Sequence, residues 1–133
     1  MKITKFEDLE IWKLSLTITK QIYDISFKKD FSRDFALRDQ IRRATISISS
    51  NIVEGFEKNN NNEFVRYLRI AKGSTGEVRN QLYIALSISY ISQKDFNKIN
   101  KALIDLANQI GKLISYLEKL KKTRQTRKPE INE

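Results

Sequence analysis

The sequence predicts an all-α fold, an antiparallel up-down bundle of four helices, and three observations support this. The 133 residues include one proline and four glycines, and so few helix-breaking residues favour long helices. Apolar residues recur at intervals of three and four over several long segments, which is the spacing of one helix face. The connections between these segments are short, and four long helices joined by short connections pack most simply as an up-down bundle.

The first helix is predicted over residues 8–26. Its core stripe is expected to consist of residues at helical spacing, namely Leu9, Trp12, Leu16, Thr19 and Tyr23. A second apolar set lies roughly 120–180° around the same helix, at about 100° per residue, and comprises Ile11, Ile18, Ile22 and Ile25. The first helix therefore carries more apolar surface than one bundle face requires.

The second helix is predicted over residues 32–56, with Ser32 as its N-cap. Its expected core stripe is Leu37, Ile41, Ala44, Ile48 and Ile52. Three further apolar residues lie off that face, namely Phe35, Ile46 and Val53.

The third and fourth helices are predicted over residues 60–91 and 92–121. Asn60 with Glu63, and Ser92 with Asp95, have the spacing of helix-capping pairs. The third helix has an apolar stripe of Phe64, Leu68, Ala71, Thr75, Val78, Leu82 and Ala85. The fourth alternates steps of three and four, as in a coiled coil, through Phe96, Ile99, Leu103, Leu106, Ile110, Leu113, Leu117 and Leu120. Residues 1–122 are thus expected to form one bundle, and residues 123–133 a basic disordered tail.

Two glycines, Gly73 and Gly76, interrupt the third helix, each at a cost of about 1 kcal/mol relative to alanine. They indicate the close approach of another backbone. One interpretation is a tight crossing within the bundle. The other is a subunit interface on the outer face, which also carries Ile70, Glu77 and Ile84. Since second apolar stripes on a small protein are typical of association surfaces, we expect a homo-oligomer.

Residue types exclude several classes of function. The chain has no histidine and no cysteine, so it lacks the residues of Ser/His or Cys/His catalysis and of histidine or cysteine zinc sites. We therefore expect no catalytic residues, no metal and no cofactor. The N-terminal residues lack the apolar run of a signal peptide, and no run of about 18 apolar residues is present. A cytoplasmic protein without membrane contact is expected.

The charge balance favours a polyanionic partner. The chain has 25 basic and 16 acidic residues, a net charge of +9, which is compatible with nucleic-acid binding. The candidate nucleic-acid-binding residues are Arg38, Arg42, Arg43, Arg66, Arg69, Lys72 and Arg79. The alternative is that these residues are solvated or bridge subunits. No DNA-reading or RNA-reading motif is present, so binding is expected to depend on backbone and shape, with RNA favoured over DNA.

Polar residues interrupt the second and third helices beside their core stripes. A structural hydrogen-bond network that fixes helix register is expected from Gln40, Asn51, Glu54, Ser74 and Glu77. The alternative is that Glu54 and Glu77 hold a metal or act as acid and base.

The combination of these motifs resembles a known family. The pattern comprises Phe6-x-x-Leu9-x-x-Trp12, Gln40-Ile41-Arg42-Arg43-Ala44, Ser47-Ile48, Asn51-Ile52-x-Glu54-Gly55 and Ala71-x-Gly73-Ser74-x-x-Glu77. Over residues 6–120 it resembles the four-helix-bundle proteins encoded in intervening sequences of 23S ribosomal RNA. This resemblance implies a ring-like homopentamer and a relation to accessory proteins of diversity-generating retroelements. It leaves open an alternative function as a protein-interaction scaffold or accessory subunit, for example of a reverse transcriptase.

Overall fold

The computed structural model describes residues 2–122, with side chains described as far as residue 120. A 3-10 turn at Phe6–Asp8 precedes α1 (Glu10–Ser26), the short α2 (Lys29–Arg33), α3 (Phe35–Glu57), α4 (Asn61–Ser87) and α5 (Gln93–Lys122). No β-strand occurs in this part of the chain, which confirms the all-α prediction. The predicted C-terminal tail, residues 123–133, lies outside the described residues.

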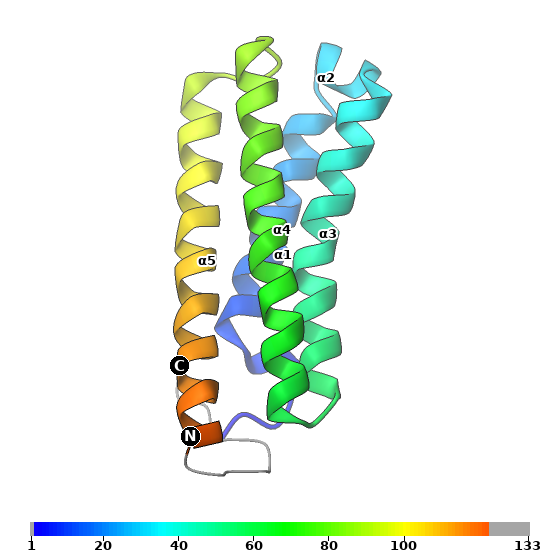
Figure 1. Ribbon diagram of the computed structural model, residues 1–133. Coiled ribbons are helices and arrows are strands. Elements are labelled where there is room, and N and C mark those ends of the chain that lie inside the picture. The colour runs from blue at the N-terminus through cyan, green and yellow to red at the C-terminus, as the bar shows by residue number, and fades with distance from the viewer. Residues whose placement is uncertain (1, 123–133) are drawn as a thin grey trace.

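The four long helices lie side by side (Figure 1). α3 packs against α1 and α4, and α5 packs against α4 and α1, so that each long helix contacts two others around a common core. The α3–α4 connection lies at one end of the molecule, and the α4–α5 connection lies at the other end beside α2 (Figure 1).

Helix starts follow the capping side chains. Asn60 accepts a hydrogen bond from the Glu63 amide at 3.0 Å, and Ser92 accepts one from the Asp95 amide at 3.1 Å, which confirms both predicted caps. The predicted start at Ser32 is wrong, because residues 29–33 form α2 and Asp34 caps α3 by accepting the Leu37 amide at 3.1 Å. The third predicted helix also ends earlier, at Ser87, and Ser89 in the following connection has a φ of 65°.

The predicted core stripes of α3, α4 and α5 are confirmed. Ile41, Ile48 and Ile52 are fully buried, as are Leu68, Val78 and Leu82 on α4 and Leu103, Leu106 and Ile110 on α5. Burying each such side chain contributes about 1.5–3 kcal/mol to the free energy of folding. The core therefore follows the three-and-four periodicity in these helices.

The predicted core stripe of α1 is confirmed at Leu9, which is fully buried, and is wrong over the rest of the helix. Ile11, Ile18, Ile22 and Ile25 are at most 4% exposed, whereas Leu16 is 44% exposed. The buried side also holds two serines whose hydroxyls are satisfied by the helix itself, since Ser15 donates to the Trp12 carbonyl at 2.6 Å and Ser26 to that of Tyr23 at 3.3 Å. Trp12, Thr19 and Tyr23 are only partly buried. Both stripes of α1 have helical spacing, so periodicity by itself did not distinguish the inner one.

The glycines behave differently from one another. A Cβ built on Gly55 of α3 would lie 2.6 Å from the Tyr67 Cβ of α4, so this glycine permits a close α3–α4 crossing. Around Gly73 and Gly76 the corresponding positions are open, with no described atom within 4 Å. The interpretation of these two glycines as a tight crossing within the bundle is therefore wrong.

Candidate nucleic-acid interface

The seven basic residues predicted to bind nucleic acid do not form one patch. Arg38, Arg42 and Arg43 lie near the start of α3, whereas Arg66 lies in the second turn of α4. The remaining three lie along the side of α4 that contacts α5, namely Arg69, Lys72 and Arg79.

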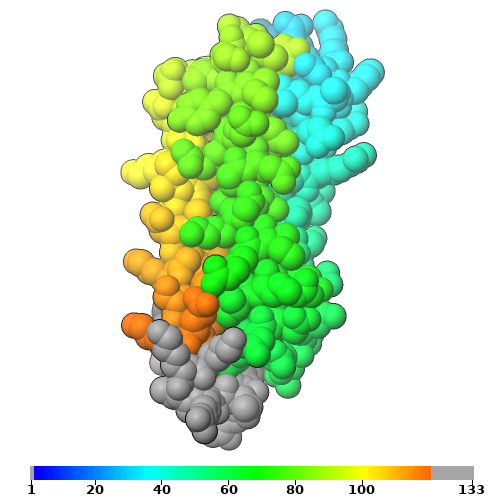
Figure 2. All heavy atoms as spheres, in the orientation of Figure 1, coloured from blue at the N-terminus to red at the C-terminus, as the bar shows by residue number. Residues whose placement is uncertain are grey.

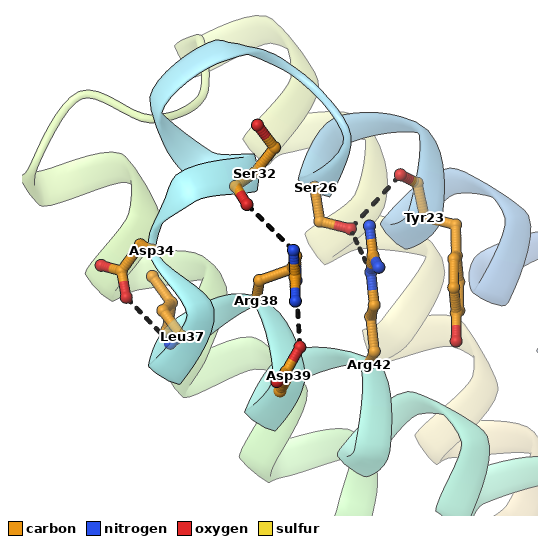
Figure 3. A network of polar contacts seen from close by, with 8 residues as sticks. All are labelled: Tyr23, Ser26, Ser32, Asp34, Leu37, Arg38, Asp39 and Arg42. Carbon is orange, nitrogen blue, oxygen red and sulfur yellow. Dashed lines mark hydrogen bonds and ion pairs between the residues drawn. The ribbon is translucent and has the colours of Figure 1, made fainter.

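Arg42 is packed into the seam between α1 and α3 (Figure 3). Its guanidinium carbon lies 4.5 Å from the ring centroid of Tyr23 and 4.5 Å from that of Phe27. Its Nε donates to the Ser26 hydroxyl at 2.9 Å, and its Nη2 is buried with no hydrogen-bond partner among the described residues. This guanidinium therefore joins two helices and has little exposed surface to offer a phosphate.

Arg38 is also held in place (Figure 3). It donates to the Ser32 carbonyl and to the Asp39 carboxylate, both at 3.0 Å, and its guanidinium lies 4.7 Å from the centroid of the Phe35 ring. Arg43, the next residue after Arg42, is instead exposed, and no ion pair to it occurs among the described residues.

The charge of Arg66 is balanced by Glu63, three residues earlier on the same helix. Its guanidinium donates twice to the Glu63 carboxylate, at 2.9 and 3.2 Å, and lies 4.5 Å from the Tyr67 ring centroid. The hydrogen bond from Arg66 lowers the pKa of Glu63, and the same bond is the main cause of the raised pKa of Arg66. Both groups are thus charged at neutral pH, and their pairing reduces the net charge that Arg66 offers.

The α4–α5 side combines basic residues with a groove. Arg69 pairs with Glu118 at 2.9 Å, and the Arg79 Nε donates to the Asn100 side chain at 2.8 Å. Lys72 extends over α5, with its Nζ 3.7 Å from the position that a Gly111 Cβ would occupy. Arg69, Lys72 and Gly111 line a groove of about 540 Å³. Lys72 and Gly111 also line an adjoining hollow of about 650 Å³.

A line of lysines runs along the outer face of α5, and two of its members, Lys112 and Lys119, line the same hollow as Lys72. Its members are exposed, and none of them forms an ion pair among the described residues; they are Lys94, Lys98, Lys101, Lys112 and Lys119. Their spacing of 4, 3, 11 and 7 places them opposite the Phe96/Leu103 core stripe at about 100° per residue, and the exposed acid Asp105 lies on the same face in the interval of 11. That spacing is a signal present in the sequence, and these lysines are additional to the seven basic residues predicted from it. Figure 2 shows α4 and α5 adjacent on one face of the molecule.

The predicted polar network is present only in part. The Ser47 and Ser74 hydroxyls lie 3.0 Å apart across the α3–α4 contact, and the Asn51 amide donates to the Ser47 carbonyl and hydroxyl at 2.7 and 2.9 Å. Glu54 accepts a separate hydrogen bond from the Tyr67 hydroxyl at 2.8 Å. Gln40 and Glu77 are exposed and lie outside these contacts.

Glu54 and Glu77 are not brought together. Tyr67, the partner of Glu54, precedes Glu77 on α4 by ten residues, which is about 15 Å at 1.5 Å per residue. Within residues 2–122 no cluster of three potential metal-ligating side chains of the His, Cys, Asp or Glu type occurs. The arrangement therefore offers no support for the alternative of a two-carboxylate site.

None of the helices in the described part of the chain combines the length and the apolar character that crossing a membrane requires.

Comparison with known proteins adds two findings. A profile of the family described as "23S rRNA-intervening sequence protein" matches residues 7–122. A crystal structure from Bacteroides thetaiotaomicron, described as a protein of unknown function from the S23 ribosomal protein family, is similar to this chain with a TM-score of 0.73. The two share 23% identity, over 79% of this chain and 95% of the other, so this likeness concerns the fold. No curated protein matches the chain.

Proposed function

Because the chain belongs to the 23S rRNA-intervening sequence protein family, we propose that it is a non-catalytic, oligomeric bundle that binds structured or ribosomal RNA. The four long helices of this bundle are proposed to run antiparallel, up and down in turn, because only short connections join α3 to α4 and α4 to α5. The basic surface that binds RNA is proposed to be the α4–α5 side.

The line of lysines on α5 is the observation that carries this proposal. Lys94 and Lys119 are 25 residues apart, which is about 37 Å along the helix, so the line is long enough to contact several phosphates. Lys72 adds a cation on the neighbouring helix beside the groove. Exposed lysines act as point charges toward phosphate, and such contacts fix position without reading sequence. Recognition by backbone and shape follows, as is common for structured RNA.

The proposal is tested by charge reversal with a matched control. Lys72→Glu with Lys112→Glu changes the net charge by −4 on the α4–α5 side. Lys13→Glu with Lys20→Glu makes the same change on α1, where both lysines are exposed and paired with acids. We expect the first variant to lose at least about tenfold in affinity for a structured RNA, with a shallower dependence on salt, because fewer counterions are released. The control is expected to stay within a few-fold of the wild type.

Fluorescence anisotropy over a range of salt concentrations measures both quantities. Equal losses in the two variants would show that only net charge matters and would contradict the α4–α5 surface. Failure of the wild-type protein to bind RNA at low salt would contradict the proposed function itself.

A homo-oligomer is proposed as the form in which this surface acts. Leu16 on α1 and Ile46 on α3 are 44% and 43% exposed, and Ile70 and Ile84 on α4 are 43% and 41% exposed. Two separate apolar faces on one subunit suit a head-to-tail ring. The number five, carried by the resemblance, is proposed for this ring.

The second candidate function is that of a protein-interaction scaffold or accessory subunit, for example of a reverse transcriptase. The same exposed apolar residues favour it, since a partner protein would cover them as well as a second copy would. Copurification of a partner together with an absence of RNA binding at physiological salt would favour the scaffold.

A further inference from the structure

We propose that Phe27 and Phe35 form a platform on which unpaired bases of single-stranded RNA stack. This inference rests on the proposed RNA-binding function, but it concerns another part of the molecule and another mode of contact. The platform lies at the end of the bundle where α1, α2 and α3 meet, while the lysines of α5 belong to the α4–α5 side.

The exposure of the two phenylalanines is the first observation. Phe27 is 65% exposed and Phe35 is 64% exposed, more than any other large apolar side chain in the described part of the chain. Phe27 directly follows α1 and Phe35 is the first residue of α3. Aromatic rings so open to solvent have a face available for stacking, and every base offers a π-face in return.

The rings are supported by two arginines one helical turn apart. The Arg42 guanidinium lies 4.5 Å from the Phe27 ring centroid and the Arg38 guanidinium 4.7 Å from that of Phe35. Hydrogen bonds hold both arginines, from Arg42 to Ser26 and from Arg38 to Ser32 and Asp39 (Figure 3). The rings therefore lie against groups that are already fixed, and binding a base costs little additional ordering.

The local charge favours an RNA strand over a second protein subunit. Lys28 and Lys29 follow Phe27 in the chain, and Arg43 lies one residue beyond Arg42. All three are exposed, and none forms an ion pair within the described residues. Protein–protein interfaces are depleted of lysine, whereas aromatic rings beside unpaired cations are the usual combination for binding single strands. Bases in a duplex are already stacked on each other, so the platform selects unpaired bases.

The test compares alanine variants on full-length protein. Phe27→Ala and Phe35→Ala remove one exposed ring each, and Ile88→Ala is the matched control, because Ile88 directly follows α4, is 48% exposed and lies outside both the platform and the proposed subunit interface. The probes are a labelled single-stranded oligoadenylate and a labelled RNA duplex. We expect each phenylalanine variant to lose about tenfold in affinity for the single strand, as is typical for loss of one stacked base, with no change for the duplex or in the salt dependence.

A second measurement reports stacking directly. Tryptophan replaces Phe27 in one variant and Ile88 in another, each in a Trp12→Phe background. We expect oligoadenylate to quench the fluorescence of the Phe27→Trp variant and not that of the Ile88→Trp variant.

The outcomes separate this inference from the proposed function. RNA binding that is unchanged in both phenylalanine variants would overturn the platform and leave the α4–α5 surface standing. Equal losses on single strand and duplex would also overturn it, because stacking on duplex bases is blocked. A wild-type protein that binds neither probe would overturn both proposals.

Discussion

At the scale of single residues, Arg42 and Arg43 show that neighbouring identical side chains have different roles. Arg42 lies between the rings of Tyr23 and Phe27 and donates to Ser26, while Arg43 is exposed. Both arginines were predicted from the sequence to bind nucleic acid. The difference of about 100° around the helix placed one arginine in a seam and the other in solvent.

Arg42→Ala is expected to lower the free energy of unfolding by about 1–3 kcal/mol, because two cation–π contacts and one hydrogen bond are lost. Arg43→Ala is the matched control and should change it by less than about 0.5 kcal/mol. Urea denaturation followed by circular dichroism measures both values. Equal effects of the two substitutions would contradict the packed position of Arg42.

Asp34 links two parts of the bundle end. One of its carboxylate oxygens accepts the Leu37 amide at the start of α3, and the other accepts the Tyr90 hydroxyl at 2.9 Å. The hydrogen bond to this carboxylate raises the pKa of Tyr90. A raised pKa in the folded state means that the stabilisation is complete below the unfolded-state pKa of about 10 and is lost as the pH rises through the folded-state value.

Tyr90→Phe is therefore expected to lower the free energy of unfolding at neutral pH, because the hydrogen bond to the Asp34 carboxylate is lost. The difference from the wild type should shrink as the pH rises above about 10, the unfolded-state pKa, and through the raised pKa of the folded state. Tyr83→Phe, at a tyrosine that is 51% exposed, serves as the control and should have little effect at either pH. A difference between Tyr90→Phe and wild type that grows with pH would contradict the assigned hydrogen bond.

At the scale of helices, the crossing of α3 and α4 depends on a glycine that the periodicity did not single out. Gly55 lets the Tyr67 side chain approach, while the space around Gly73 and Gly76 is open among the described residues. No contact within the described part of one subunit requires glycine at these two positions of α4. Their position on the outer face agrees with the proposed subunit interface.

Gly55→Ala is expected to lower the free energy of unfolding by about 1–3 kcal/mol, because the added methyl group forces the helices apart. Gly73→Ala should raise it by up to about 1 kcal/mol, because alanine is the better helix former and nothing obstructs its Cβ. Thermal unfolding under conditions where the protein is monomeric shows whether each substitution raises or lowers the free energy of unfolding. Destabilisation by Gly73→Ala in the monomer would show that its surroundings are not open.

At the scale of the whole molecule, one subunit leaves several apolar side chains exposed, and we propose that a second copy covers them. The isoleucine stripe of α1 is buried in the core, whereas Leu16 on its other stripe is 44% exposed. On α3, Ile46 is 43% exposed.

Light scattering coupled to size-exclusion chromatography should give a wild-type mass well above the 15.6 kDa of one chain. Leu16→Glu with Ile46→Glu is expected to shift the protein to monomers, because two charges would be buried without partners in the interface. Thr17→Glu with Asn108→Glu places the same charges at exposed polar positions and should leave the mass unchanged. A monomeric wild type would contradict the proposed oligomer.

The sequence by itself determined the all-α class, the extents of the long helices to within a few residues, and the core of α3, α4 and α5. It did so because each of those helices has one continuous stripe at helical spacing and because Asn60 and Ser92 cap with their own local amides. Local chemistry of this kind needs no distant partner.

The tertiary structure decided the rest. It determines which of the two apolar stripes of α1 is buried. Both stripes have the same period, and burial depends on which neighbouring helices enclose each face. The tertiary structure also separated Glu54 from Glu77 and engaged Arg42, Arg66 and Arg69 with Phe27, Glu63 and Glu118. These contacts depend on the rotation and height of each helix in the bundle, and a sequence pattern specifies neither quantity.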